Sequence, residues 1–549
     1  MLLDTRSIPN GQTLLTDVCI VGAGAAGITL AMELMGTGLN IILLEAGGRS
    51  RAGTSQKLYE GHVNDLFRHL PLDQARYRQL GGTTSLWGGR CIPFDEIDFA
   101  EREWVSHGGW PITKTDLVPY YRRAHDYCEC GAYDYRVPSA LPGTPVEMLP
   151  AFKDGLVSTA KLERWSPPTQ FGKKYKPALA RAENVRVFLH AVAMELICAP
   201  TGNRIEQVEV AALYGGKFSI RAKQTVLAGG GLEVTRLLLS SNRVHPQGIG
   251  NHSDWLGRGY MSHIHGTIAR VRLTAGREVI FGYETDPQGV FCRRHIAISE
   301  DVQRKYGLLN HYLVLDRPLL GDPAHEDGVL SAAYLLKRLF GGRQQEKLGT
   351  GKYALYWRHL KNILRGSPQA LSILPKFGRG RLLQRRRVPS LLLGSRSNEY
   401  YLYFQSEQIP DRNSRVTLDD ARDAFGMPRL RLDFRVSSQE HDSVLHVHRL
   451  IDDELRRQGC GSLAYLGDDP RDQVQEAKAV LGHHIGTTRM SEAGSQGVVN
   501  PDCRVHGLSN LFVASSSVFP TSSHANPTLT IVALAIRLAD HLKRNITTV

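Results

Sequence analysis

The sequence lacks any apolar stretch long enough to cross a membrane. No run reaches about 18 consecutive apolar residues, the length that a transmembrane helix needs. Residues 1–12 contain neither the apolar core of a secretory signal peptide nor a twin arginine. We therefore expect a protein that is neither exported nor membrane-spanning, and we predict a cytoplasmic location.

Paired cysteines are also missing from this chain of 549 residues. The 8 cysteines are scattered and none forms a Cys-x-x-Cys pair, although Cys128 and Cys130 are separated by a single residue. Neither a disulfide framework nor a zinc site is therefore expected, and we predict no metal centre. Unpaired thiols fit a reducing compartment.

Excess charge is absent from most of the chain, although the formal net charge is +13. The segment 337–396 contains 15 Lys or Arg and one acid, Glu346, so it carries +14 and the rest of the chain −1. No nucleic-acid-reading motif accompanies this charge, and we expect no nucleic-acid partner. Residues 334–340 and 356–365 have the pattern of basic amphipathic helices. Such helices can lie on an anionic membrane, dock a partner, cover a polyanion such as an anionic substrate, or pack on the domain as a solvated insertion.

The strongest feature that is present lies near the N-terminus. An apolar run, 18–21, leads into the motif Gly22-Ala23-Gly24-Ala25-Ala26-Gly27. A helical pattern follows, and a second apolar run, 41–44, ends at Glu45. This order predicts a strand, a tight turn, a helix and a parallel strand with an acid at its tip.

Each conspicuous residue of this unit has a role in dinucleotide binding. Gly22 allows the turn, Gly24 lets a pyrophosphate approach the helix N-terminus, and Gly27 lets the helix pack close to the strand. Glu45 stands where a carboxylate can accept hydrogen bonds from ribose hydroxyls. We predict a dinucleotide site, the alternative being a glycine-rich turn in an ordinary βαβ unit.

Two later segments extend this prediction. The segment 81–91 holds four glycines and three hydroxyl residues, so its amides can line a planar, polyanionic ligand, although it can also be a plain surface loop. Strand patterns begin at 185, and the run 222–231 ends in glycines before a helical stretch at 234–241. The chain thus returns to the nucleotide-binding sheet, which makes that domain discontinuous.

Alternating apolar and polar residues at 266–320 and 399–435 predict an antiparallel sheet in a second domain. The expected fold is therefore α/β, with a Rossmann-like domain and a substrate domain. We assign 1–100, 180–262 and 476–549 to the first, and 101–179 and 263–475 to the second, with a basic amphipathic insertion at about 330–396.

The C-terminal part has the pattern of a catalytic region. A strand at 510–515 and a loop precede a strongly apolar helix, with Asn526 where an N-cap would be and Pro527 at the first helical position. The positive end of this helix can stabilise developing negative charge. His483, expected at the end of a helix over 469–481, can take a proton from an alcohol if the fold brings it close.

Three blocks together resemble the glucose–methanol–choline (GMC) family of flavoprotein oxidoreductases. They are the N-terminal motif with Glu45-Ala46-Gly47, the loop 81–91, and the region 483–530. The run 500–507 with Asn526-Pro527-Thr528 looks most like the branch of pyranose oxidases and bacterial glycoside dehydrogenases. The resemblance implies FAD as cofactor, and hydride transfer from the alcohol carbon to flavin N5.

Residue roles follow from the same resemblance. His483 matches the base, with His484 as its rival, and Asn526 matches the partner that hydrogen-bonds the substrate oxygen. The residues expected to contact FAD are Gly22, Gly24, Ala26, Gly27, Glu45, Ala46, Gly81, Gly82, Thr83, Ser85, Trp87, Gly88, Gly89, Ala193, Ala228, Gly229, Ser515, Ser516, Pro527 and Thr528.

The sequence departs from the family pattern at three positions. Pyranose oxidases hold their flavin through a histidine in the block that matches 81–91; Leu86 stands there, so FAD should be non-covalent. Ser515 occupies a position where many members have an aspartate. His524 replaces a residue that is commonly small, and is either a third polar group facing the substrate or a loop residue.

We therefore expect oxidation of a secondary hydroxyl of a sugar or glycoside to a ketone, with O2 or another compound as electron acceptor. The alternative is oxidation of a primary alcohol to an aldehyde on an amino sugar or other natural-product intermediate. A nucleotide-binding protein without redox chemistry and an NAD-dependent dehydrogenase are the rival classes. The pair His483 and Asn526 argues against the first, and the lack of a second dinucleotide motif against the second.

Overall fold

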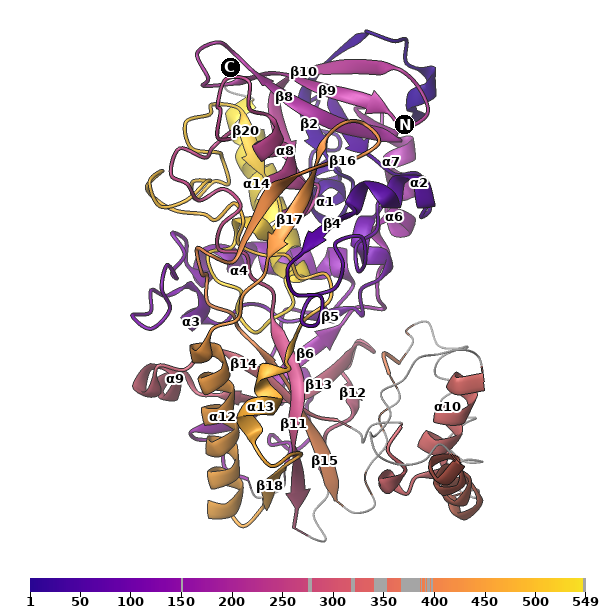
Figure 1. The fold of residues 1–549 in the computed structure, drawn as a ribbon, viewed down its shortest axis with the longest axis vertical. Helices are drawn as coiled ribbons and strands as arrows, with labels where there is room; N and C mark the ends of the chain where they lie inside the picture. Colours follow the sequence, from indigo (N-terminus) through magenta and orange to yellow (C-terminus); the bar gives the residue numbers. More distant parts are fainter. Residues whose placement is uncertain are drawn as a thin grey trace.

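The computed structural model describes residues 1–149, 152–274, 279–316, 321–339, 353–366, 386, 388–390, 392, 395 and 398–546. Two large sheets lie at opposite ends of the long axis (Figure 1). The α/β class, with one mainly parallel and one antiparallel sheet, is thereby confirmed. Much of the basic segment 337–396 lies outside the described residues.

The first sheet has eight strands in the order β1-β7-β3-β2-β10-β9-β8, with β20 also paired to β10. All of its pairs are parallel except those that involve β8 and β9. The strands are β1 (Leu2–Asp4), β2 (Thr13–Val21), β3 (Ile41–Glu45), β7 (Val185–Leu189), β8 (Ala191–Cys198), β9 (Ile205–Ala212), β10 (Lys217–Leu227) and β20 (Leu511–Val513). Every residue of β3 is buried, as expected for a parallel strand covered on both faces.

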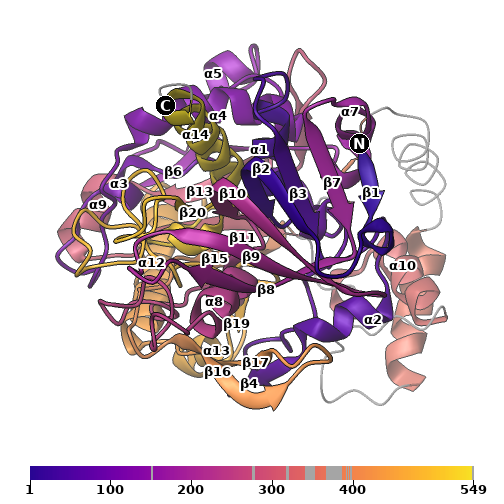
Figure 2. The same cartoon turned by 90° about the horizontal axis from the view of Figure 1, so that it is seen from above.

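Helices from both ends of the chain cover this sheet. α1 (Ala25–Glu33) packs against the long C-terminal helix α14 (Thr528–Ile546), which also packs against α4 (Lys114–Cys128). Figure 2 shows α1 and α14 side by side next to β2 and β10. α8 (Gly231–Ser240) follows β10, as the sequence predicted. The domain boundaries themselves stay a prediction.

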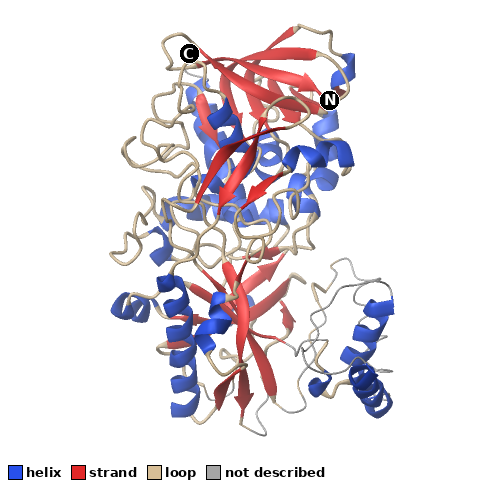
Figure 3. Ribbon diagram, in the orientation of Figure 1, coloured by secondary structure: helices blue, strands red, loops and turns tan. Residues whose placement is uncertain are grey.

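The second sheet has nine strands in the order β18-β11-β15-β14-β13-β6-β5, with β12 paired to β13 and β19 to β11. α12 (Ser438–Arg457) runs alongside it and contacts β18 (Figure 3). The strands are β5 (Arg90–Cys91), β6 (Val157–Trp165), β11 (Ile264–Leu273), β12 (Tyr283–Thr285), β13 (Phe291–Ile298), β14 (His311–Asp316), β15 (Glu399–Ser406), β18 (Gly461–Tyr465) and β19 (Lys478–Ala479).

Part of the stretch 399–435 does not join this sheet. Only β15 does so; β16 (Arg415–Arg422) and β17 (Pro428–Asp433) form a separate three-stranded sheet with β4 (Gly61–Val63). β4 pairs in parallel with β17 across more than three hundred residues of sequence. Local alternation of side chains predicts a strand but not its partner, which is why the expected single sheet was wrong here.

The expected helix over 469–481 is also much shorter in the structure. α13 spans Pro470–Gln475 and is followed by β19, which pairs with the start of β11. The remaining helices are α2 (Gly53–Gln56), α3 (Glu96–Phe99), α5 (Val137–Ala140), α6 (Phe171–Lys174), α7 (Lys176–Arg181), α9 (Glu300–Tyr306), α10 (Gly328–Leu339) and a helical stretch at 353–366. Among the described helices, none has the length and apolarity needed to span a bilayer.

Candidate active site

A cavity of about 700 Å³ opens at the carboxyl ends of β2, β3 and β10. Its size is within the usual range for cofactor sites, and its position follows the rule for ligands of parallel sheets. The predicted site residues in its lining are Gly22, Gly24, Ala26, Glu45, Ala46, Gly82, Thr83, Trp87, Gly88, Gly89, Ala193, Ala228, Gly229, His483, Ser515, Ser516, Asn526, Pro527 and Thr528.

Three predicted cofactor contacts are not part of this lining. A Cβ on Gly27 would lie 1.9 Å from the carbonyl oxygen of Gly22, and one on Gly81 would lie 2.4 Å from the amide of Gly172. These two glycines therefore allow close backbone packing. Ser85 receives a hydrogen bond from Gln79 at 2.5 Å. Their direct contact with FAD stays a prediction.

Gly24 differs from the other glycines of the turn. Gly22 has a φ of +107° and no room for a Cβ, whereas a Cβ on Gly24 would meet no described heavy atom within 4 Å. This open space beside the backbone suits a diphosphate at the N-terminus of α1. The Glu45 carboxylate accepts hydrogen bonds from the amides of Ala23 (3.1 Å) and Gly47 (2.8 Å), and burial raises its pKa. Each of its oxygens keeps a lone pair for a ribose hydroxyl.

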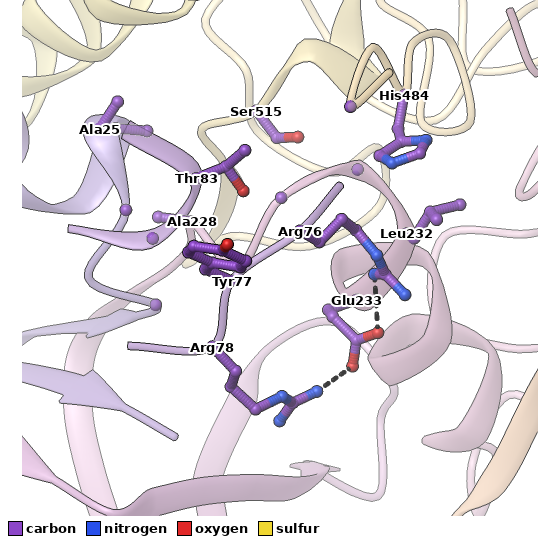
Figure 4. Close-up of a pocket in the computed structure, with 18 of the residues that line it drawn as sticks. Ala25, Arg76, Tyr77, Arg78, Thr83, Ala228, Leu232, Glu233, His484 and Ser515 are labelled. Atoms are coloured by element: carbon purple, nitrogen blue, oxygen red, sulfur yellow. Dashed lines mark hydrogen bonds and ion pairs between the residues drawn. The ribbon is translucent and has the colours of Figure 1, made fainter. Parts of the chain in front are cut away.

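Sequence reasoning missed a charged cluster on another wall of the cavity. Arg76 and Arg78 both donate to Glu233, at 3.1 and 2.6 Å (Figure 4). Both guanidinium groups also lie over the ring of Tyr59. Burial alone would raise the pKa of Glu233, but Arg78, Arg236 and Arg76 lower it to about 2. Glu233 thus faces three lining arginines, of which Arg236 also pairs with Asp423, so this wall keeps a positive charge that suits phosphates. The only sequence signal was two arginines just before the loop 81–91.

His483 is held by a second histidine, His263, which directly precedes β11. The two Nδ1 atoms of His483 and His263 are 2.8 Å apart, and His263 Nε2 lies 3.1 Å from the carbonyl oxygen of Ser522. A carbonyl oxygen only accepts, so His263 must donate from Nε2. Burial lowers the pKa of His263 to about 3, so the ring is neutral and its Nδ1 is an acceptor.

The tautomer of His483 follows from this arrangement. Because His263 Nδ1 accepts, His483 donates from its own Nδ1 and keeps a lone pair on Nε2. His483 lines the cavity, and its Nε2 has no hydrogen-bond partner in the described part of the chain. Burial, with the neighbouring His263 and Arg90, holds the pKa of His483 well below its ordinary value. The residue is therefore a neutral base with a lone pair available to a ligand.

His484 also lines the cavity, but on a different wall. Its Nδ1 is 2.8 Å from the hydroxyl of Tyr260, which lies 2.8 Å from His69 Nε2. Burial lowers the pKa of His484, with Arg76 as the largest charge contribution, whereas Arg90 acts on His483. His484 therefore belongs to the side of Arg76 and Glu233, as Figure 4 also shows.

Asn526 is oriented by residues that sequence reasoning did not select. Its Oδ1 accepts from Arg90, through both Nε (3.2 Å) and Nη2, and from Gln405 Nε2 at 3.2 Å. Arginine has no acceptor, so the atom facing it must be the amide oxygen. The Nδ2 group has no partner among the described residues and can donate to a ligand oxygen. The side chain does not cap α14, which begins at Thr528, so the expected N-cap role was wrong.

Arg90 is itself fixed by its surroundings. It donates to Gln405 Oε1 at 2.6 Å, and its guanidinium lies 4.2 Å from the ring centre of Tyr312. The Tyr312 hydroxyl donates to Glu163 at 2.6 Å. Arg90, Gln405 and His263 come from β5, β15 and the residue before β11, so only the tertiary fold brings them together.

The remaining expectations concern His524 and Ser515. His524 is 2% exposed and is not part of the cavity lining, and neither ring nitrogen has a hydrogen-bond partner in the described chain. It lies near Asp95 and Asp98, but Asp98 already accepts from Asn310, Ser523 and the Asp95 amide. The absence of a metal centre stays a prediction. Ser515 accepts from the amide of Ser517 at 3.2 Å within the lining.

Comparison with known proteins gives three findings. Residues 410–535 match the family model described as GMC oxidoreductase. The chain is 24% identical to 6'''-hydroxyparomomycin C oxidase of Streptomyces lividus over 96% of this chain and 92% of that protein, and 34% identical to C-glycoside 3-oxidase of Arthrobacter globiformis over 25% of each. The crystal structure of formate oxidase superposes with a TM-score of 0.55 at 18% identity, covering 98% of this chain and all of that one.

These findings agree with the geometry of the cavity. FAD is the cofactor expected of the family, and the open backbone at Gly24, the carboxylate of Glu45 and the arginine wall fit an adenine dinucleotide. The structural match shows the fold, and the family match covers the C-terminal region that contains His483 and Asn526. The chain thus resembles the GMC oxidoreductases through residues 410–535, and it is an oxidoreductase that acts on CH–OH groups as an oxidase or a dehydrogenase.

Proposed function

We propose that the protein uses non-covalent FAD to oxidise a secondary hydroxyl of a sugar or glycoside to a ketone. The observation that carries the proposal is the pairing of a histidine with a fixed lone pair and an amide with a free N–H group at one cavity. The similarity to a C-glycoside 3-oxidase supports the choice of substrate class.

His483 and Asn526 have different roles at the hydroxyl group of the substrate. His483 Nε2 accepts the hydroxyl proton as the C–H bond is broken, since its Nδ1–H is committed to His263. Asn526 Nδ2 donates to the same oxygen and fixes its position. FAD, when bound, supplies the acceptor for the hydride. Pro527 and Thr528 line the cavity, so the positive end of α14 faces it and favours negative charge there.

The non-covalent attachment rests on Leu86. This side chain lines the cavity. The resemblance matches its position to the histidine that binds the flavin in pyranose oxidases, and an alkyl group forms no such bond. O2 or another compound as electron acceptor, and a cytoplasmic location, stay predictions.

A second candidate is oxidation of a primary alcohol to an aldehyde on an amino sugar or other natural-product intermediate. The similarity to 6'''-hydroxyparomomycin C oxidase over nearly the whole chain favours it. The same proton acceptor and amide donor serve both reactions, so a test with substrates of each kind must distinguish them.

The decisive experiment records the absorbance of the purified protein before and after acid precipitation, and then adds glycosides and amino sugars anaerobically to the intact protein. We expect a yellow supernatant, and bleaching by substrates with a secondary hydroxyl at the reacting carbon. Flavin that stays with the precipitate would contradict non-covalent binding. Bleaching only by primary alcohols would establish the second candidate, and a colourless protein would overturn both.

The base assignment is tested with His483→Ala, using His484→Ala as the matched control. We expect His483→Ala to keep its flavin and to slow flavin reduction by substrate by about 10²- to 10⁴-fold. The control should be affected much less, because His484 lies on the side of Arg76. A near wild-type rate for His483→Ala would show that the assignment is wrong.

A further inference from the structure

The two helices of the basic insertion pack against each other with polar groups on the inside. The ring of His359 stacks on Tyr334 with centres 4.3 Å apart, and its Nδ1 lies 3.0 Å from the Ser331 hydroxyl. Asn362 donates to the carbonyl of Pro323 at 2.8 Å. His359 is fully buried and Asn362 nearly so. The contact of 353–366 with α10 therefore includes polar side chains that normally face water, beside the buried Tyr334 and Leu355.

Six large apolar side chains of these helices are exposed, although Val329, Leu330, Tyr334 and Leu355 are buried. Tyr353, Trp357, Leu360 and Leu364 are 92%, 66%, 41% and 69% exposed. Their spacing of four, three and four residues places them in one line along the helix. On α10, Leu336 and Leu339 are 54% and 80% exposed. We call these six residues the outward stripe. So many large apolar side chains exposed together on two helices are unusual for a surface that meets only water, so the outward stripe indicates a surface that contacts a membrane or another molecule.

Cationic side chains flank the outward stripe. Arg358, Lys361 and Arg365 are exposed and follow one edge of it. Neither α10 nor 353–366 contains an acidic residue. The segment 337–396 carries +14, while the rest of the chain sums to −1, and five of its basic residues lie on the two described helices: Lys337, Arg338, Arg358, Lys361 and Arg365.

We propose that the outward stripe binds the surface of an anionic lipid bilayer. Leucine, tryptophan and tyrosine on one face, with lysine and arginine beside them, are the composition of helices that lie in the headgroup region. Such helices bury their apolar face about 5–10 Å deep while basic groups contact anionic headgroups. The charge sign selects an anionic membrane. The helices lie flat, since no described helix meets the requirements of a membrane span.

The placement of the insertion is compatible with this contact. In Figure 1, α10 and its partner helix lie to one side of the second sheet, away from α12 and well separated from the first sheet. The protein can therefore bind a bilayer through the outward stripe without unfolding either sheet. The proposal is independent of the substrate, because none of the six residues lines the cavity.

The test is co-sedimentation of the full-length protein with phosphatidylcholine vesicles, with and without phosphatidylglycerol. We expect binding to the anionic vesicles only, and weaker binding as salt is raised. The double variant Trp357→Ser/Leu364→Ser should bind at least tenfold more weakly. The control variant Leu15→Ser/Leu66→Ser removes two leucines that are 71% and 63% exposed elsewhere and should bind as the wild type does.

A second measurement covers the case in which the double variant misfolds. Tryptophan emission of the wild type should shift to the blue with anionic vesicles, and Trp357→Tyr should abolish that shift while sedimentation with vesicles persists. The proposal would be overturned if the wild-type protein did not bind anionic vesicles. It would also be overturned by a double variant that binds vesicles normally but changes from dimer to monomer in light scattering, which would assign the outward stripe to a second copy of the chain.

Discussion

His483 depends on a carbonyl group that it does not touch. Ser522 sets the protonation of His263, and His263 sets that of His483, so the lone pair on Nε2 is a consequence of backbone position. An imidazole alone in the cavity would exchange between two tautomers, of which only one accepts a proton at Nε2. The second histidine thus acts through the first, as a positioning residue.

Substitution of His263 separates positioning from packing. His263→Phe fills the site but offers no acceptor, so we expect flavin reduction by substrate to slow by about 10- to 100-fold. His263→Gln keeps an acceptor for His483 and a donor for Ser522, and should recover most of the rate. The wild-type rate should stay constant as pH falls to about 6, because the pKa of His483 lies well below its ordinary value. Equal loss in both variants would point to a purely structural role.

Substitution of Asn526 tests its expected hydrogen bond to the substrate oxygen. Asn526→Asp replaces the free N–H group by a carboxylate oxygen that repels an alcohol giving up its proton. We expect the limiting rate of flavin reduction to fall by about 10²- to 10³-fold, the usual effect of losing such a donor. Asn413→Asp, the same change on an exposed loop, is the control and should leave the rate unchanged. An unaffected rate in Asn526→Asp would remove this residue from the reaction.

The limits of sequence reasoning are clearest for these residues. His483 and Asn526 could be selected because each lies in a recognisable motif at the end of an element. His263, Arg90 and Gln405 could not, because β19 must pair with β11 before His263 meets His483, and β5 must approach β15 before Arg90 meets Gln405. Such pairings join segments separated by hundreds of residues and leave no local pattern.

Among the elements, the turn between β2 and α1 allows a test that separates folding from cofactor binding. A Cβ at Gly24 would meet no described heavy atom within 4 Å, and its φ is −81°. Gly24→Ala should therefore fold with little change in the free energy of unfolding of the apoprotein. The added methyl occupies the space expected for a diphosphate, so the dissociation constant for FAD should rise at least tenfold.

Gly53→Ala provides the matched control, since it also adds a methyl in open space at the start of a helix but lies outside the cavity lining. It should leave both FAD affinity and melting temperature unchanged. Flavin titration and thermal melts of the apoproteins decide the matter. Wild-type affinity in Gly24→Ala would place the diphosphate elsewhere.

Elements with a strong pattern were predicted well, and those without one were not. The apolar runs of β2 and β3 and the long apolar face of α14 indicated their structures directly. The region after α12 was misjudged because a polar helical pattern and a two-residue strand look alike over so few positions. β19 exists through its pairing with β11 and has no independent signal.

Over the whole molecule, buried neutral histidines predict a loss of stability in acid. Burial lowers the pKa of His263 and His311 to about 3, and that of His69, His448 and His524 to about 4. In the unfolded chain each titrates near 6.5, so below that pH the unfolded state binds more protons. Their contribution is fully present above about 6.5 and is lost as pH falls towards 4.

In this window, each such histidine lowers the free energy of unfolding by up to about 1.4 kcal/mol for each unit by which the pH falls. The melting temperature should therefore fall steeply between pH 6.5 and 5.0. His448→Leu removes one titrating group and should make the decline shallower. A melting temperature that stays constant from pH 7.5 to 5.0 would show that these histidines are protonated in the folded protein.

The strand order of the first sheet has a consequence for biosynthesis. β20 completes that sheet beside β10, and α14 covers α1, yet both come from the last forty residues, whereas β2 and α1 come from the first forty. On the ribosome, the glycine turn is therefore made several hundred residues before the strand and the helix that complete its sheet and cover α1. A nascent chain therefore exposes an incomplete sheet until residues 511–546 have been made, and we expect cofactor loading to follow their synthesis.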